Sequence, residues 1–176
     1  MEYKSSKGNK NIYKNEILHA LLKDPTKSSR TIAKELKSYR QKIWREKKKL
    51  EEEHVIWGYT AVIDEGKLNH VSYVMLLKMK PMNKELADLM LKRLYERAQE
   101  KQNVRLQDLW IVNGEYDWVL RFSAPNRATA RRYYETIRHL YDEYLLEKPV
   151  MIDVNFCLVE EGKINPELEK LREFIP

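Results

Sequence analysis

The sequence predicts an α+β protein with an N-terminal winged-type helix-turn-helix domain and a C-terminal ferredoxin-like βαββαβ domain. Three observations support this fold class. Short segments with helical spacing of apolar residues fill the first third of the 176-residue chain. From residue 71 the apolar residues alternate with a period of two, and strand-like and helix-like segments follow in the order β-α-β-β-α-β. The positive charge is concentrated in the first third.

The charge distribution separates the two parts of the chain. Residues 1–56 hold 15 of the 33 Lys and Arg but 8 of the 27 Asp and Glu, a net charge of +7. Residues 57–176 hold the other 18 and 19, a net charge of −1. The basic excess of the whole chain therefore comes from its first third, which indicates an anionic partner for that part alone.

We expect residues 1–11 to form a flexible tail and residues 12–56 to form the helix-turn-helix domain. A first helix is predicted near Tyr13 to Lys23, ending at Asp24-Pro25, with Ile17, Leu18, Leu21 and Leu22 on one apolar stripe. Ser28 or Ser29 can cap a short second helix. A third helix is predicted from about Tyr39 to Glu53, with Ser38 and Gln41 spaced as a capping box.

The third helix is largely basic, and its apolar positions are few: Ile43, Trp44 and Leu50. A short helix, a tight turn and a basic helix form the arrangement in which the last helix enters the major groove of DNA. The alternative is a solvated Lys- and Glu-rich helix with no partner, since such helices are common on protein surfaces. The confinement of the charge to this domain favours DNA.

The C-terminal domain is expected at residues 71–160, after a strand and linker at residues 57–70 and before a helical tail at residues 161–176. "VIWGYTAVID", residues 55–64, has the pattern of a strand, and "VSYVMLLKMK" begins the period-two region. Two helices are predicted, one from Lys84 to Glu100 capped by Asn83, and one from Asn126 to about Glu147. The closing strand is "PVMIDVNFCLVE".

A hairpin is predicted between "VRLQDLWIV" and "EYDWVLRFS", with Asn113-Gly114 as a two-residue type I′ turn. One face of the resulting sheet is expected to pack against the two helices. The other face is also apolar, and we assign to it Ser72, Val74, Leu76, Leu109, Ile111, Met151, Cys157 and Val159. A face of this kind favours a sheet-to-sheet contact, most simply in a homodimer.

Other classes of protein are disfavoured by what the sequence lacks. It has no apolar run of about 18 residues to cross a membrane and no apolar core of a signal peptide near its start. The single Cys157 fits a reducing compartment, so a cytoplasmic location is expected. No phosphate-binding loop, metal-ligand cluster or nucleophile constellation is present, so neither catalytic residues, a metal nor a cofactor is expected.

Two strings in the expected order, "LEEEHVIWGYTAVID" and "VNGEYDWVLRF", are similar to the "LEEEGVIxGYTAxxD" and "VxGxYDxxL" patterns of the Lrp/AsnC family. Proteins of this family are leucine-responsive, or feast/famine, transcription regulators of bacteria and archaea, and we expect an archaeal member here. The resemblance covers about residues 12 to 160. It implies binding of double-stranded DNA, a homodimer that can assemble into tetramers or octamers, and a C-terminal ligand-sensing (RAM) domain that binds an amino acid or another small effector between subunits.

The resemblance also implies functional residues. The predicted DNA contacts are Ser29, Arg30, Tyr39, Arg40, Gln41, Lys42, Arg45, Lys48 and Lys49. The predicted effector contacts are Gly114, Glu115, Tyr116 and Asp117, where backbone N–H groups can hold a ligand carboxylate and Asp117 can accept from an ammonium group. The alternative for this loop is structural, with Tyr116 packed and Asp117 capping the turn. An alternative for the whole chain is a siroheme decarboxylase-like enzyme, which shares this architecture.

The sequence departs from the family pattern at three positions. Lys37-Ser38-Tyr39 stands where Gly-Leu-Ser is usual before the recognition helix, so a residue with a side chain occupies a position that often needs positive φ. Lys47 replaces a usual apolar residue late in that helix, and His54 replaces the Gly of "EEEG". The extension after residue 160 is also atypical.

Overall fold

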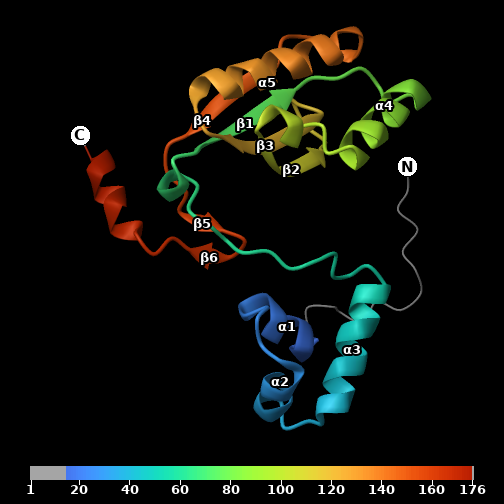
Figure 1. The fold of residues 1–176 in the computed structure, drawn as a ribbon, viewed down its shortest axis with the longest axis vertical. Helices are drawn as coiled ribbons and strands as arrows, with labels where there is room; N and C mark the ends of the chain where they lie inside the picture. Colours follow the sequence, from blue (N-terminus) through green and yellow to red (C-terminus); the bar gives the residue numbers. More distant parts are fainter. Residues whose placement is uncertain (1–14, 176) are drawn as a thin grey trace. The chain divides into compact units, whose positions relative to one another are not determined.

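The computed structural model describes residues 15–175, and the chain divides into two compact units between Ala61 and Val62 (Figure 1). The predicted tail at residues 1–11 and the expected helix start at Tyr13 lie outside the described residues. The predicted fold class is confirmed: three helices form the first unit, and a four-stranded antiparallel sheet with two helices forms the second.

The N-terminal unit contains α1 (Glu16–Lys23), α2 (Ser29–Glu35) and α3 (Arg40–Glu52). The helix starts are set by side chains: Asn15 accepts hydrogen bonds from the backbone N–H groups of Ile17 and Leu18, and Ser28 accepts one from Thr31, as predicted for the second helix. The helices enclose a small core of Ile17, Leu21, Ile32, Ala33 and Ile43. Leu22, expected in this core, is exposed because the core covers only one side of α1.

The helices α2 and α3 end in the same way, each with a non-glycine residue in the left-handed region. After α2, Lys37 has φ +47°, its N–H donates to Lys34 O, and Ser38 N–H donates to Ala33 O. After α3, His54 has φ +55°, and the same two bonds reach Glu51 O and Leu50 O. These are Schellman motifs, which usually carry Gly at this position. Lys37 and His54 therefore keep the geometry of the family glycines that they replace.

Three predictions for this region are wrong. Tyr39, not Ser38, is the N-cap residue of α3, and no side chain caps the helix, so the predicted box does not form. Residues 15–61 contain helices and loops but no strand, so this range holds no wing. The strand predicted at residues 55–64 is also absent, because no other described segment pairs with this extended stretch. Its Trp57 side chain is 95% exposed.

The C-terminal unit is built on β1 (Val71–Leu77), β2 (Arg105–Ile111), β3 (Trp118–Ala124) and β4 (Val150–Val154), in the antiparallel order β2-β3-β1-β4. The helices α4 (Lys84–Tyr95) and α5 (Arg127–Leu140) cover one face of this sheet (Figure 1). Asn83 caps α4, as predicted, by accepting from Leu86 N–H, and Asn126 caps α5 by accepting from Thr129 N–H. Both helices end earlier than expected and are followed by the 3-10 turns Glu100–Gln102 and Asp142–Tyr144.

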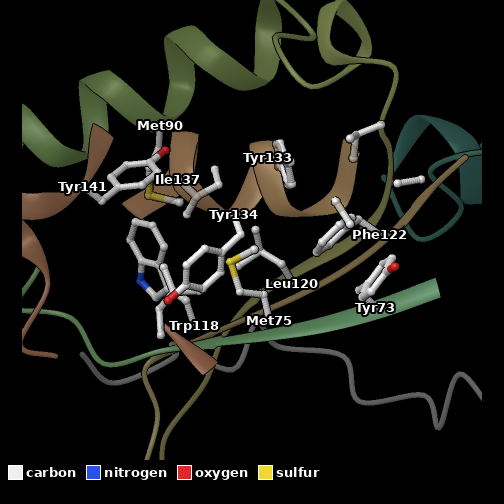
Figure 2. Close-up of a cluster of buried hydrophobic side chains, with 14 of the residues drawn as sticks. Tyr73, Met75, Met90, Trp118, Leu120, Phe122, Tyr133, Tyr134, Ile137 and Tyr141 are labelled. Atoms are coloured by element: carbon white, nitrogen blue, oxygen red, sulfur yellow. The ribbon is translucent and has the colours of Figure 1, made fainter. Parts of the chain in front are cut away.

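The main core lies between the sheet and these helices, and it is rich in aromatic rings (Figure 2). Tyr73 of β1 stacks on Phe122 of β3 with ring centroids 5.3 Å apart, and Phe122 meets Tyr133 of α5 edge-on at 5.0 Å. Trp118 meets Tyr141 edge-on at 5.4 Å. Such contacts contribute beyond area burial, by about 0.5–1.5 kcal/mol per pair. They fix the sheet that carries the loop before β3 and the open face.

The hairpin between β2 and β3 differs from the predicted two-residue turn. Val112 N–H donates to Asp117 O at 2.8 Å, so the connection is a four-residue loop at residues 113–116. Gly114 does not have positive φ, which a type I′ turn would need. Instead, positive φ at both turn residues occurs at Glu161 and Gly162, which join β5 (Val159–Glu160) to β6 (Lys163–Ile164).

The predicted last strand is therefore two elements, since β4 ends at Val154 and the small β5–β6 hairpin follows. Its predicted faces are also reversed: Met151 pairs with Met75 and packs on the core, which places Val150 and Ile152 on the open face. Leu109 of β2 likewise packs on the core. The predicted C-terminal helix forms as a 3-10 helix, Leu168–Phe174, after Asn165 accepts from Glu167 N–H at 2.8 Å.

Candidate functional site

The exposed face of α3 carries the first candidate site. Trp44, Arg45 and Lys48 lie three, four and seven residues after Gln41, so the four side chains share one face of the helix. Ile43 and Leu50 are buried on the opposite face. The thin apolar stripe predicted from the sequence is thus enough to hold the helix, and it leaves a wide basic surface exposed.

The other predicted DNA contacts surround this face or lie at the start of α2. Tyr39, Arg40 and Lys42 are exposed at the start of α3, and Lys49 is exposed near its end. Arg30 is exposed in the first turn of α2, whereas Ser29 is half-buried there. The structure therefore brings the predicted residues of α3 together on one helix and places Arg30 on the helix before it in the same three-helix unit.

Two of the lysines form ion pairs along the helix. Lys48 lies 3.5 Å from Glu52 and Lys49 lies 3.8 Å from Glu53. Exposed pairs of this kind contribute about 0.3–0.5 kcal/mol. Such weak pairs do not prevent a lysine from turning to a phosphate group, so the basic face of α3 remains available to an anionic partner.

Two residues of α3 differ from expectation. Trp44 is 53% exposed on the basic face, although it was expected to pack inward, and Lys48 Nζ lies 5.5 Å from the centre of its ring. Lys47 lies 4.6 Å above the ring of Tyr59. Burial and a hydrogen bond to Glu51 raise the pKa of Tyr59 to about 12, so this phenol stays neutral at ordinary pH. Trp44 is therefore a further candidate contact, which its neighbours at helical spacing could have indicated.

The loop before β3 carries the second candidate site. Gly114 and Glu115 are exposed at its tip, and Tyr116 and Asp117 are half-buried. Asp117 Oδ2 accepts from Met79 N–H at 2.7 Å, and its own N–H donates to Leu77 O at 2.9 Å. One carboxylate oxygen of Asp117 is thus used to join the loop to the end of β1.

Lys78 is the cation next to this loop, and it was not among the effector contacts predicted from the sequence. Its Nζ lies 3.5 Å from Glu115 Oε1, 3.1 Å from Glu147 Oε1 and 5.4 Å from the centre of the Tyr116 ring. The hydrogen bond to Glu147 is the main cause that raises the pKa of Lys78. A charged lysine beside exposed loop residues can bind a ligand carboxylate. Its position directly after the alternating strand was the signal that could have identified it.

The open face of the sheet is the third feature. The registers place four apolar side chains side by side across its four strands: Trp110, Val119, Leu76 and Val150. Val74 and Ile152 extend this patch toward the middle of the sheet. Beside it, Arg121 Nε donates to Asp108 at 2.5 Å, and its guanidinium lies 3.2 Å from Glu160 of β5. A patch of this composition on an antiparallel sheet is typical of a contact surface.

Within residues 15–175, no group of three or more His, Cys, Asp or Glu side chains is placed to hold a metal ion. No helix in the described part of the chain is long and apolar enough to cross a bilayer.

The comparison with solved structures gave consistent matches to Lrp/AsnC-type regulators. An AsnC family transcriptional regulator from Agrobacterium tumefaciens matches with a TM-score of 0.60 at 21% identity, covering 86% of this chain and 94% of that one. The leucine response regulatory protein LrpA of Mycobacterium tuberculosis matches with a TM-score of 0.65 at 15% identity, covering 86% and 96%. LrpC of B. subtilis matches with a TM-score of 0.58 at 19% identity, covering 80% and 91%.

A transcriptional regulator from Neisseria meningitidis, solved as a complex with L-Met, matches with a TM-score of 0.59 at 14% identity, covering 82% of this chain and 89% of that one. No protein-family model matches the sequence, and no curated protein matches it. The class of protein that the fold defines is therefore a two-domain chain with a helix-turn-helix unit and a ferredoxin-like unit. More particularly, the chain has the fold of the Lrp/AsnC transcription regulators.

Proposed function

We propose that this protein is a DNA-binding transcription regulator of the Lrp/AsnC type, whose DNA binding or assembly is modulated by a small metabolite. The observation that carries the proposal is the exposed basic face of α3, in a helix-turn-helix unit attached to a domain of the ligand-sensing fold. Gln41 and Arg45 present an amide and a guanidinium on this face, the groups that read adenine and guanine edges. Lys48 and Lys49 supply cations for phosphates.

The salt dependence of DNA binding tests this function. Anisotropy titrations with labelled duplex fragments from the organism's own genome should show a log–log slope against salt of about −0.9 for each phosphate neutralised. The double variant Arg45→Ala/Lys48→Ala should weaken binding and make that slope less steep by about two units at most. The control variant Lys84→Ala/Lys92→Ala removes two exposed cations from α4 and should bind as the wild type does.

A slope near zero with every fragment would contradict DNA binding. Equal losses in the two double variants would contradict the assignment to α3, because both variants change the net charge by the same amount. Only a specific loss in the α3 variant supports a recognition helix.

We also propose a homodimer formed through the open sheet face. The apolar row of Trp110, Val119, Leu76 and Val150 supports this proposal, because a two-fold axis is the simplest way for a second copy to cover it. The homo-oligomer brings two α3 helices to one DNA duplex, and two half-sites about one helical turn apart are then expected.

For the effector, we propose the loop at residues 113–117 together with Lys78. The L-Met complex of the Neisseria meningitidis protein supports an amino acid as the first ligand to test. Lys78 can bind the ligand carboxylate, and the Asp117 oxygen not used by Met79 can accept from its ammonium group. A thermal-shift screen of the twenty amino acids should give a hit that Lys78→Met abolishes and Lys84→Met retains. A screen without any hit would contradict an amino acid effector.

A further inference from the structure

A cavity of about 600 Å³ lies within the C-terminal unit, and none of residues 113–117 lines it. One wall is the segment of residues 62–72, and the other is formed by residues 154–167, which include the β5–β6 hairpin. Figure 1 shows these two segments next to each other below the start of β1. Its size is within the range of small-molecule sites. None of the roles proposed above uses this cavity.

The polar side of the cavity is formed by Glu65, whose side chain is 7% exposed. Its Oε1 accepts from Arg105 and from Gln107 Nε2, the latter at 2.9 Å. Its Oε2 makes no hydrogen bond, and neither does His70 Nδ1, which lies 3.4 Å away on the same wall. A buried carboxylate oxygen without a donor is costly, and native structures seldom keep one without a reason.

The charges around the cavity define the complementary ligand. Four carboxylates and two lysines line it, but three of the carboxylates are already paired: Glu65 with Arg105, Glu160 with Arg121 and Glu167 with Lys67. The carboxylate oxygen of Glu65 can only accept a hydrogen bond. Because charged N–H donors bond a carboxylate more strongly than neutral ones, Glu65 Oε2, which makes no hydrogen bond, favours a cation that carries N–H groups.

Apolar side chains form part of the remaining lining: Val71 at the start of β1, Val154 at the end of β4, Phe156 just after it, and Ile164 of β6. These side chains can cover a short hydrocarbon chain. A ligand with an ammonium group at one end would place that group beside Glu65 and its methylene groups against the apolar side chains. The burial of the Cys157 thiol nearby, with Glu160 beside it, raises the pKa of the thiol, so this side chain adds no negative charge.

We propose that this cavity binds a small aliphatic amine in its protonated form, with the ammonium N–H donating to Glu65 Oε2 as the His70 ring turns aside. The binding step does not depend on DNA. Residues 62–70, which form one wall, directly follow the helix-turn-helix unit, so an amine held there contacts the connector between the two units. A regulatory effect of the amine rests on the proposed function, whereas its binding does not.

Calorimetric titration of the full chain with three compounds of equal length tests the proposal: cadaverine, the corresponding diol, and glutarate. Cadaverine should bind and raise the melting temperature, while the neutral diol and the anionic glutarate should not, since only the diamine carries charged donors. The assay contains no DNA, so it can succeed when DNA binding fails and fail when DNA binding succeeds.

Three variants locate the site. Glu65→Gln should weaken cadaverine binding roughly 10- to 100-fold, the range expected when a charged hydrogen bond is lost. Ile164→Trp narrows the cavity at an exposed wall position and leaves the Glu65 contacts intact, so it should weaken binding without lowering stability. Glu96→Gln, an exposed carboxylate at the end of α4, should bind as the wild type does.

Several results would overturn the proposal. One is binding of the diol or of glutarate as tight as that of cadaverine. Others are unchanged cadaverine binding in both Glu65→Gln and Ile164→Trp, or a loss in Glu96→Gln as large as that in Glu65→Gln. The last is no binding of cadaverine at about 10 mM, where even a weak specific site is largely filled.

Discussion

The carboxylate of Asp117 accepts a hydrogen bond from the backbone N–H of Met79 at 2.7 Å, which joins the loop before β3 to the chain leaving β1. The same residue donates its own N–H to Leu77 O. Asp117 therefore holds the candidate effector loop in place, whatever contact its second oxygen makes.

The first prediction concerns this bond. Asp117→Ala should lower the free energy of unfolding of the C-terminal unit by about 1–3 kcal/mol, because Met79 N–H loses a charged acceptor. Asp117→Asn keeps an acceptor oxygen and should recover part of the loss. Urea denaturation followed by tryptophan fluorescence measures this, with the exposed Glu115→Ala as the control. Equal stability of Asp117→Ala and wild type would show that this bond contributes nothing net.

The second prediction concerns the two Schellman motifs. Lys37 and His54 adopt positive φ at a cost of about 1 kcal/mol each relative to glycine. Lys37→Gly and His54→Gly should therefore each stabilise the N-terminal unit by roughly 0.5–1 kcal/mol, the balance of relieved strain and lost chain stiffness.

The circular dichroism of an N-terminal fragment would depend on whether the fragment folds on its own. Thermal unfolding of the full chain therefore measures these stability changes. The control is Lys34→Gly, inside α2, which should destabilise by about 1 kcal/mol. Destabilisation by all three substitutions would show that the left-handed conformation of Lys37 and His54 does not cost about 1 kcal/mol relative to glycine.

The third prediction concerns the open sheet face. Ile152→Glu places a charge in the apolar patch and should increase the dimer dissociation constant at least about tenfold, because an unpaired buried carboxylate is costly. Sedimentation equilibrium measures this. Leu91→Glu, at a similarly exposed position on α4, is the matched control and should leave association unchanged. If Leu91→Glu separates the subunits and Ile152→Glu does not, the dimer forms through the helical side instead.

The fourth prediction concerns the pKa of Tyr133, a buried tyrosine of α5. Burial raises the pKa of Tyr133 to about 12, above its unfolded value of 10.0. The neutral phenol is favoured in the folded chain. Its contribution to the free energy of unfolding is therefore complete below pH 10 and is lost as the pH rises toward 12. For this residue alone the loss is about 2 kcal/mol between pH 9 and 12.

Urea denaturation at several pH values should show a smaller loss for Tyr133→Phe than for wild type. Tyr95→Phe, at an exposed position on α4, should keep the wild-type pH dependence. Identical pH profiles of wild type and Tyr133→Phe would contradict the raised pKa.

The elements with a strong local signal were predicted well from the sequence. Asn83 and Ser28 cap their helices as expected, because an N-cap needs only a side chain oxygen within three residues of its partner. The inward face of β1 was correct as well, since its alternation is unbroken from Val71 to Leu77.

The errors arose where distant residues decide the structure. In β4 the alternation of Val150, Ile152 and Val154 indicated an inward apolar face, but the pairing of Met151 with Met75 turns Met151 to the core instead. Asn113-Gly114 has the composition of a type I′ turn, yet the bonds of Asp117 to β1 require a longer loop. The cavity beside Glu65 could not be predicted at all, because its walls are about ninety residues apart in the sequence.

The open face of the sheet is divided along its strands. Where β1 ends, the row from Trp110 to Val150 is apolar, whereas where β1 begins, Ser72 and Ser123 lie beside Arg105. A second copy that covers the apolar row lies at the opposite end of the strands from Ser72, which lines the amine cavity. Subunit association and ligand binding then involve opposite ends of the sheet, so a mutation that dissociates the dimer need not empty the cavity, and a bound amine need not separate the subunits.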